Sequence, residues 1–178
     1  MKQKQYTNNS VSLAGEFAVL SQLALKNYDA NMTLGNTKCV DILVSNPKSG
    51  KMYQLEVKTK IGRIQGQKNR TFGLTYEWIM HKKHETLKQK NLFYCFVLIN
   101  KRMVQKGKSN AEEKDLRFFV VPNESVKKYI KVQHRFWLKG KKNRKDNPMR
   151  KFRIGLDDKG YTIDTPLAEK YENNWDFK

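Results

Sequence analysis

Two carboxylates and a lysine stand among apolar residues in two short segments of the N-terminal half. Asp41 is followed by Ile-Leu-Val, and Glu56 and Lys58 alternate with apolar residues in Leu-Glu-Val-Lys. A charge inside a sheet is costly unless it is paired or holds a metal. Carboxylates that hold a hard cation beside a lysine can activate a water and neutralise a phosphate. The spacing therefore favours metal-dependent hydrolysis of a phosphodiester bond.

A third acid belongs to the same group. Residues 10–26 predict a helix capped by Ser10 or Ser12, and Glu16 falls on its apolar face. The other members of that face are Leu13, Phe17, Leu20, Leu23 and Ala24. Glu16 is also one of only four acidic residues among the first 76. We therefore expect its carboxylate to point toward the sheet.

The residue types indicate a separate role for each side chain. Asp41 and Glu56 are expected to hold Mg²⁺ or Mn²⁺ through oxygen, with the Val57 carbonyl and waters completing the shell. Lys58 would orient or deprotonate the attacking water. Glu16 would bind a second cation or a metal-bound water.

Strands and helices must bring these residues together. The residues from Asn46 to Gly50 predict a turn, and a turn centred between Lys48 and Ser49 places Asp41 opposite Glu56 in a hairpin. The pattern predicts strands over residues 30–34, 39–45 and 52–60, a second helix over 75–89 anchored by Trp78 and Ile79, and a central strand over 92–99. The expected order is αβββαβ, an α/β fold with a mixed central sheet flanked by helices.

The rest of the chain is more basic. We expect a charged loop over residues 101–114, a strand over 117–121, a short helix over 125–132 capped by Asn123, and an irregular tail over 157–178 anchored by Trp175. The length suits one domain spanning residues 1–178, with a core over about 10–122 and a basic C-terminal extension over about 123–178.

Charge indicates a polyanionic partner. Lys and Arg number 36 against 17 Asp and Glu, which gives a formal net charge of +19. No apolar run is long enough to span a membrane, and the N-terminus lacks a signal-peptide core, so we expect a cytoplasmic protein that binds nucleic acid. Cys39 and Cys95 are expected to be reduced core residues rather than a disulfide or a zinc knuckle.

Two basic segments are candidates for contact with nucleic acid. One is the loop after the predicted hairpin and the other lies within residues 139–153, the densest basic stretch. The candidate residues are Lys60, Arg63, Gln65, Lys68, Arg70, Lys141, Lys142, Arg144 and Arg150. The aromatic residues near the second segment, Phe136, Trp137 and Phe152, are expected to be core.

Two histidines, His81 and His84, lie three residues apart in the predicted second helix. They do not form the HExxH motif and the sequence shows no third ligand, so a solvated helix face is favoured over a zinc site.

Three segments together resemble a known family. Gly15-Glu16, Val40-Asp41-Ile-Leu-Val44 and Leu55-Glu56-Val-Lys58-Thr59 are similar to the PD-(D/E)XK nuclease superfamily, which includes restriction endonucleases and archaeal-type Holliday junction resolvases. The resemblance covers about residues 10–100 and departs from the name-giving pattern at Val40, where that pattern has proline. It implies a restriction-endonuclease-like fold, Glu16, Asp41 and Glu56 as metal ligands, and Lys58 as the catalytic lysine.

The expected function is therefore a metal-dependent endonuclease acting on double-stranded or branched DNA, in a restriction, repair or junction-resolving role. The superfamily's usual reaction leaves a 3′-hydroxyl and a 5′-phosphate. Cleavage of both strands of a duplex implies a homodimer. No small-molecule cofactor is expected. Two alternatives stay open. One is a non-catalytic nucleic-acid-binding protein that keeps the fold, and the other is an RNA-associated basic protein whose charged strand residues form an ion-pair network.

Overall fold

The chain folds as a mixed α/β protein, as predicted. The computed structural model describes residues 6–33, 39–104, 116–140, 142–159 and 161–177. The elements are, in order, α1 (Asn8–Leu25), β1 (Asp29–Met32), β2 (Ile42–Ser45), β3 (Met52–Gly62), β4 (Gln67–Asn69), β5 (Gly73–His81), the 3-10 helix η1 (Lys82–Glu85), β6 (Leu92–Asn100), α2 (Lys101–Val104), β7 (Leu116–Pro122), α3 (Asn123–Lys139), β8 (Met149–Gly155) and α4 (Ala168–Tyr171). None of the described helices is long and apolar enough to cross a membrane.

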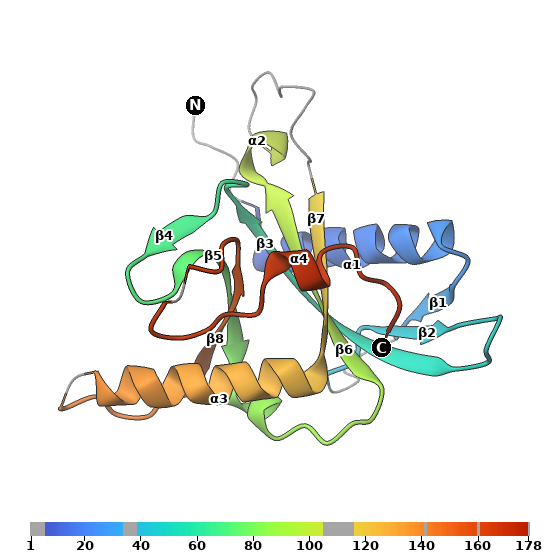
Figure 1. Cartoon of the computed structure of the whole chain (residues 1–178). Helices are drawn as coiled ribbons and strands as arrows, with labels where there is room; N and C mark the ends of the chain where they lie inside the picture. Colours follow the sequence, from blue (N-terminus) through green and yellow to red (C-terminus); the bar gives the residue numbers. More distant parts are fainter. Residues whose placement is uncertain (1–5, 34–38, 105–115, 141, 160, 178) are drawn as a thin grey trace.

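A five-stranded mixed sheet forms the centre of the molecule. Its strands lie in the order β1-β2-β3-β6-β7, and only the β3–β6 pair is parallel (Figure 1). Strand β6 is buried along its whole length, as its continuous apolar sequence predicted, because both faces of the sheet are covered. A second sheet, β4-β5-β8, packs against one of those faces.

Alternate residues of the central strands enter two separate cores. Leu55, Val57 and Cys95 pack with α1 and with the C-terminal Trp175. The alternate residues of β6, including Tyr94 and Phe96, pack with α3, β5 and β8 on the opposite face. Segments 149–155 and 168–171 therefore contribute buried side chains to a core shared with the N-terminal half.

The β2–β3 hairpin has the predicted register. Ile42 pairs with Leu55 and Val44 with Tyr53. The turn holds this register locally, because the Asn46 side chain accepts the backbone N–H of Lys48 and Gly50 adopts the positive φ of 64° that glycine tolerates.

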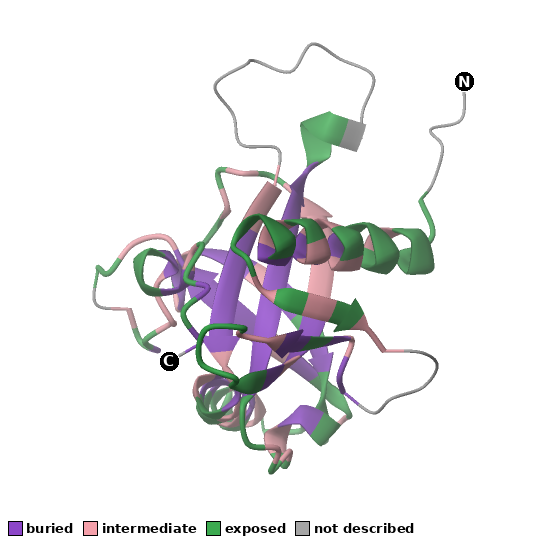
Figure 2. Cartoon of the chain, turned by 90° about the vertical axis from the view of Figure 1, so that its right-hand side faces the viewer, coloured by how far each residue is buried: buried purple, intermediate pink, exposed green. Residues whose placement is uncertain are grey.

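Helix α1 packs with a different face from the one predicted. Its N-cap is Thr7, whose hydroxyl accepts the Ser10 N–H, and its buried stripe is Gly15, Val19 and Leu23. Phe17, which was expected on the buried face, is 60% exposed. The helix docks through glycine because Gly15 approaches Thr59 of β3 closely, which turns Phe17 toward solvent. Figure 2 shows the exposed outer surface of this helix over the buried strands.

The prediction of a helix over residues 75–89 was wrong. Strand β5 occupies the first half of this range and η1 follows it. Burial alternates along β5, where Trp78 and Met80 are buried while Ile79 is exposed, and β5 pairs with β8 in a register that joins Trp78 to Phe152. Aromatic and β-branched residues favour that extended conformation once a partner strand is present.

The last third of the chain is more regular than predicted. Helix α3 begins at Asn123 rather than being capped by it and continues to Lys139, well beyond the expected end. Strand β7 and the anchoring role of Trp175 are confirmed, since Trp175 is buried against Phe118. The predicted charged loop begins with the short helix α2, and its residues 105–114 lie outside the described part of the chain.

Candidate active site

The candidate site lies at the start of β2, where β3 continues beyond the residues that pair with β2. Asp41 comes immediately before β2 and lies alongside Glu56. Its backbone N–H donates to the Leu55 carbonyl at 2.8 Å, and its Oδ2 accepts the Val57 N–H at 2.6 Å. Thr33 donates its N–H to the Asp41 carbonyl at 2.9 Å, which holds the residue from the other side. The Asp41 carboxylate thus accepts a backbone N–H of β3 at a position where β2 no longer pairs with it.

Glu56 is the most buried acid of the group, at 4% exposure. Its Oε1 lies 2.5 Å from the Lys58 Nζ, whereas its Oε2 is buried with no hydrogen-bond partner. Burial raises the pKa of Glu56, the charge of Lys58 opposes that rise, and the charge of Asp41 adds to it. An unpaired buried carboxylate oxygen is a costly arrangement that a bound cation would relieve.

Glu16 enters the site from α1. A Cβ placed on Gly15 would lie 1.8 Å from the Thr59 Oγ1, so only glycine allows the helix to come this close to β3. Burial raises the pKa of the half-buried Glu16, and the negative charges of Asp41 and Glu56 raise it further while Lys58 lowers it. The three acids therefore share one electrostatic environment, although they come from both sides of the sheet.

The tightest group of potential metal-binding atoms is not the predicted set of Glu16, Asp41 and Glu56. Among the described residues, the one group of three Cys, His, Asp or Glu ligand atoms within 4.8 Å of one another is Cys39, Glu56 and His84. Glu16 and Asp41 are electrostatic neighbours of Glu56 rather than members of this group. His84 was assigned to a solvated helix face, and that prediction was wrong, since its exposure is 2%. The sequence did not indicate that His84 is buried, because its burial depends on the turn η1, which was not predicted.

The residues around Asp41 and Glu56 fit a hard divalent cation. Two carboxylates supply oxygen ligands, and one buried oxygen has no donor to satisfy it. The N–H and carbonyl of one strand residue point to the same side of the strand. Because the Val57 N–H donates to Asp41, the Val57 carbonyl also points toward the edge of β3 that lies beyond the start of β2. These residues therefore present the oxygen-rich surroundings that Mg²⁺ or Mn²⁺ requires.

The basic loop after β3 is open to solvent. Four predicted contact residues in it are exposed, namely Arg63, Gln65, Lys68 and Arg70, and Lys142 in the later basic segment is exposed as well. Lys141 lies outside the described residues. The loop follows directly from β3, the strand that carries Glu56 and Lys58.

Three other candidates for contact with nucleic acid are used inside the molecule. Lys60 donates to the Glu77 carbonyl at 2.7 Å, and its ammonium lies 5.0 Å from the centre of the Trp78 ring. Arg144 donates to the Trp137 carbonyl and lies over that ring. Arg150 is only 4% exposed.

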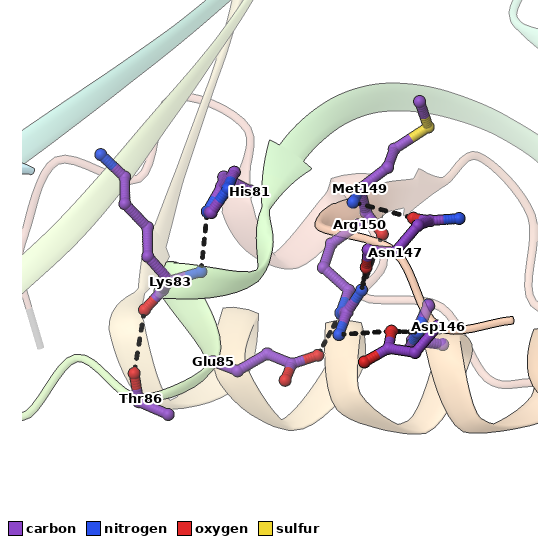
Figure 3. A network of polar contacts seen from close by, with 9 residues as sticks. His81, Lys83, Glu85, Thr86, Asp146, Asn147, Met149 and Arg150 are labelled. Carbon is purple, nitrogen blue, oxygen red and sulfur yellow. Dashed lines mark hydrogen bonds and ion pairs between the residues drawn. The ribbon is translucent and has the colours of Figure 1, made fainter.

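Internal partners surround the Arg150 guanidinium. It pairs with Glu85, reaches Asp146 and donates to the carbonyl of Asn147, as Figure 3 shows. A guanidinium held in this way has little capacity left for a phosphate. The dense basic segment therefore supplies structural ion pairs as well as surface charge.

Comparison with known proteins gives little further direction. No protein-family model matches the chain, and no curated protein matches it. Among solved structures, it is similar to a bacterial homing endonuclease, with 12% sequence identity and a TM-score of 0.48 over 97% of this chain and 91% of the other. A likeness at this level establishes neither a shared fold nor a shared activity.

Proposed function

We propose that the protein is a metal-dependent endonuclease of the PD-(D/E)XK type that hydrolyses phosphodiester bonds of DNA. The observation that carries the proposal is the buried carboxylate of Glu56, which has one unsatisfied oxygen, pairs with Lys58 and is an electrostatic neighbour of Asp41. Ionisable groups with perturbed pKa values that gather at one place are characteristic of functional sites. The formal net charge of +19 supplies the attraction for a polyanion.

Each residue of the site would have a separate role in the reaction. Asp41, Glu56 and the Val57 carbonyl would hold Mg²⁺ or Mn²⁺, which when bound neutralises the phosphate and lowers the pKa of a water. Glu16 positions that water from the helix side. Lys58 orients the water for attack on phosphorus, and the P–O3′ bond breaks to leave a 3′-hydroxyl and a 5′-phosphate.

The exposed loop would place the DNA backbone across this site. Arg63, Lys68 and Arg70 carry the positive charges, and Gln65 adds a neutral donor. Double-stranded or branched DNA is the proposed substrate, bound through phosphates rather than bases. The cytoplasm is the proposed location, because DNA is present there and both cysteines stay reduced.

Duplex cleavage requires one active site for each strand, so we propose that two copies of the chain act together as a homodimer. A dimer converts supercoiled plasmid to linear product within one binding event, whereas independent monomers accumulate the nicked form first. The ratio of linear to nicked product at limiting protein concentration tests this point.

A non-catalytic DNA-binding protein is the second candidate. It is favoured by the close Lys58–Glu56 pair, which already satisfies one carboxylate oxygen, and by the position of Glu16 and Asp41 outside the tightest ligand group. In that case the acids would be remnants of a site, and the exposed basic loop would carry the function.

Nicking of supercoiled plasmid and of branched DNA in Mg²⁺ or Mn²⁺ separates the two candidates. Lys58→Met and Asp41→Asn are each expected to lower the cleavage rate by about 10²-fold or more with the fold retained. Lys48→Met is the matched control, because Lys48 is an exposed lysine at the tip of the same hairpin. Metal-independent binding without cleavage of any of these substrates would establish the binding protein instead.

A further inference from the structure

Three buried side chains from distant parts of the sequence lie close together at the 3-10 turn η1. They are Cys39, just before β2, Glu56 on β3 and His84 on η1, and one potential ligand atom from each lies within 4.8 Å of the others. Cys39 is 5% exposed and the other two are still more buried. A thiol, an imidazole and a carboxylate rarely share an apolar environment without a ligand or a complete hydrogen-bond network.

Hydrogen bonds do not complete this group. Glu56 Oε2 has no partner, while its Oε1 is taken by Lys58. The free oxygen thus belongs to a side chain that is more than nine-tenths buried, and one oxygen of that carboxylate lies within 4.8 Å of the thiol and the imidazole. A positively charged ligand between these groups would satisfy the free oxygen.

His84 is prepared to act as a metal ligand. Its Nδ1 lies 2.8 Å from the Tyr94 hydroxyl, which leaves Nε2 for a metal, and such a second hydrogen bond commonly fixes the ring of a ligating histidine. His84 is only 2% exposed, and burial disfavours the charged form of an imidazole. Neutral imidazole is the form that binds metals.

The turn that carries His84 is fixed from both sides. The Lys83 N–H donates to His81 Nδ1, and the Thr86 hydroxyl donates to the Lys83 carbonyl at 3.2 Å. Glu85 pairs with the buried Arg150, so η1 is tied to β8 (Figure 3). A rigid support of this kind holds a ligand set in place before the metal arrives.

Cys39 is held on the opposite side of the space. Its φ of 61° is unusual for a residue other than glycine, and the next carbonyl, that of Val40, accepts the Thr33 hydroxyl at 2.7 Å. Burial and the charge of Glu56 raise the pKa of the Cys39 thiol, while Lys83 lowers it. A metal that binds a protonated thiol displaces its proton.

We propose that Cys39 Sγ, His84 Nε2 and Glu56 Oε2 form a binding site for a borderline-soft transition-metal ion of the Zn²⁺ class. Sulfur, nitrogen and one carboxylate oxygen suit zinc rather than magnesium, and three protein ligands leave a fourth position for water. Binding releases the Cys39 proton as the metal–sulfur bond forms. The site shares the Glu56 carboxylate with the hard-cation site at Asp41, and it stands whether or not the protein cleaves DNA.

Titration of the metal-free full chain with Co²⁺, followed by absorbance, tests the site directly. A thiolate-to-cobalt charge-transfer band is expected, saturating near one Co²⁺ per chain and abolished by added Zn²⁺. Cys39→Ser should remove the band, while Cys95→Ser, which changes a buried cysteine of the core that packs with α1, should leave it. Tyr94→Phe, which removes the hydrogen bond to His84, should weaken Co²⁺ binding by about 10- to 100-fold.

Asp41→Asn distinguishes this inference from the proposed nuclease. That variant should keep the cobalt band while losing Mg²⁺-dependent cleavage. Absence of the band in the wild type, or its persistence in Cys39→Ser, overturns the site. Should Cys39→Ser fail to fold, X-ray absorption of the zinc-loaded wild type decides, since the proposal requires one sulfur and at least one nitrogen neighbour and an all-oxygen shell contradicts it.

Discussion

At the scale of single residues, the site is organised around the two oxygens of Glu56. One oxygen pairs with Lys58, the other has no hydrogen bond, and the carboxylate lies within 4.8 Å of ligand atoms of Cys39 and His84. A buried carboxylate oxygen without a partner reduces the stability of the metal-free protein, and the proposed cation would relieve that cost.

Replacement of Glu56 should therefore separate stability from function. Glu56→Gln is expected to raise the free energy of unfolding in chelator by about 0.5–2 kcal/mol, because it removes a poorly solvated charge. It should also abolish cleavage and the stabilisation that divalent ions give the wild type. Thermal unfolding with and without metal measures both effects.

Glu124→Gln is the matched control, because Glu124 is a highly exposed glutamate in the first turn of α3 and its replacement should change stability little. A metal-free Glu56→Gln protein that unfolds more readily than the wild type would contradict a functional origin for the buried charge.

Lys60 predicts a pH dependence of stability. Burial lowers its pKa from 10.5 to about 8, with Glu77 partly opposing the shift. Between these values the unfolded chain keeps a proton that the folded chain has lost, so Lys60 makes the free energy of unfolding rise from pH 8 to 10.5. Below pH 8 both states are protonated and the cost of burying the charge is fully present.

Denaturant unfolding of Lys60→Met across this pH range should show a smaller rise than the wild type. Lys48→Met, at an exposed lysine, should follow the wild-type curve. Parallel curves for wild type and Lys60→Met would mean that Lys60 titrates as an exposed lysine.

At the scale of elements, the sequence was informative where pairing is local. The β2–β3 hairpin register followed from its turn residues, and the position of Asp41 beside Glu56 followed from that register. The continuous apolar run of β6 identified the central strand for the same reason, since burial on both faces needs no alternation.

Long-range pairing was not visible in the sequence. Strand β5 was mistaken for a helix because its partner, β8, lies about 70 residues further along the chain. The same pairing brings Arg153 to Glu77 and turns a basic segment partly inward. Cys39 and His84 went unrecognised as a pair because only the turn after β5 brings them together.

The contact between α1 and β3 gives a prediction at this scale. Gly15→Ala places a methyl against Thr59, so it should destabilise the protein by about 1–3 kcal/mol even though alanine favours helix. Cleavage should fall as well, because α1 carries Glu16 into the site. Denaturant unfolding and plasmid nicking measure the two effects.

A double mutant identifies the cause. Thr59→Ala removes the two Thr59 atoms other than Cβ that the new methyl would meet, so Gly15→Ala should cost less in its presence. Equal costs in both backgrounds would show that the close approach of α1 to β3 does not depend on this pair.

At the scale of the whole molecule, positive charge dominates the surface and negative charge is reserved for specific contacts. The formal net charge is +19, yet several of the 17 acids are used in internal ion pairs such as Glu172 with Arg117 and Glu77 with Lys151. Binding to DNA should therefore be strongly dependent on salt, because each phosphate contact releases counterions.

Arg70→Gln should make that dependence shallower. Removal of one phosphate contact is expected to reduce the slope of log affinity against log salt concentration by about 1, without changing preference among DNA sequences. Fluorescence anisotropy over a range of salt concentrations gives the slope, with Lys48→Gln as the control. An unchanged slope would place the DNA elsewhere than on the loop after β3.

The position of a bound divalent ion tests the account most directly. Crystals soaked in Mn²⁺ should show an anomalous peak between the carboxylates of Asp41 and Glu56, and Asp41→Asn crystals soaked in the same way should lack it. A protein that binds no Mn²⁺ at this point, or holds it only at a distant surface, would contradict the assignment of these residues as a catalytic metal site.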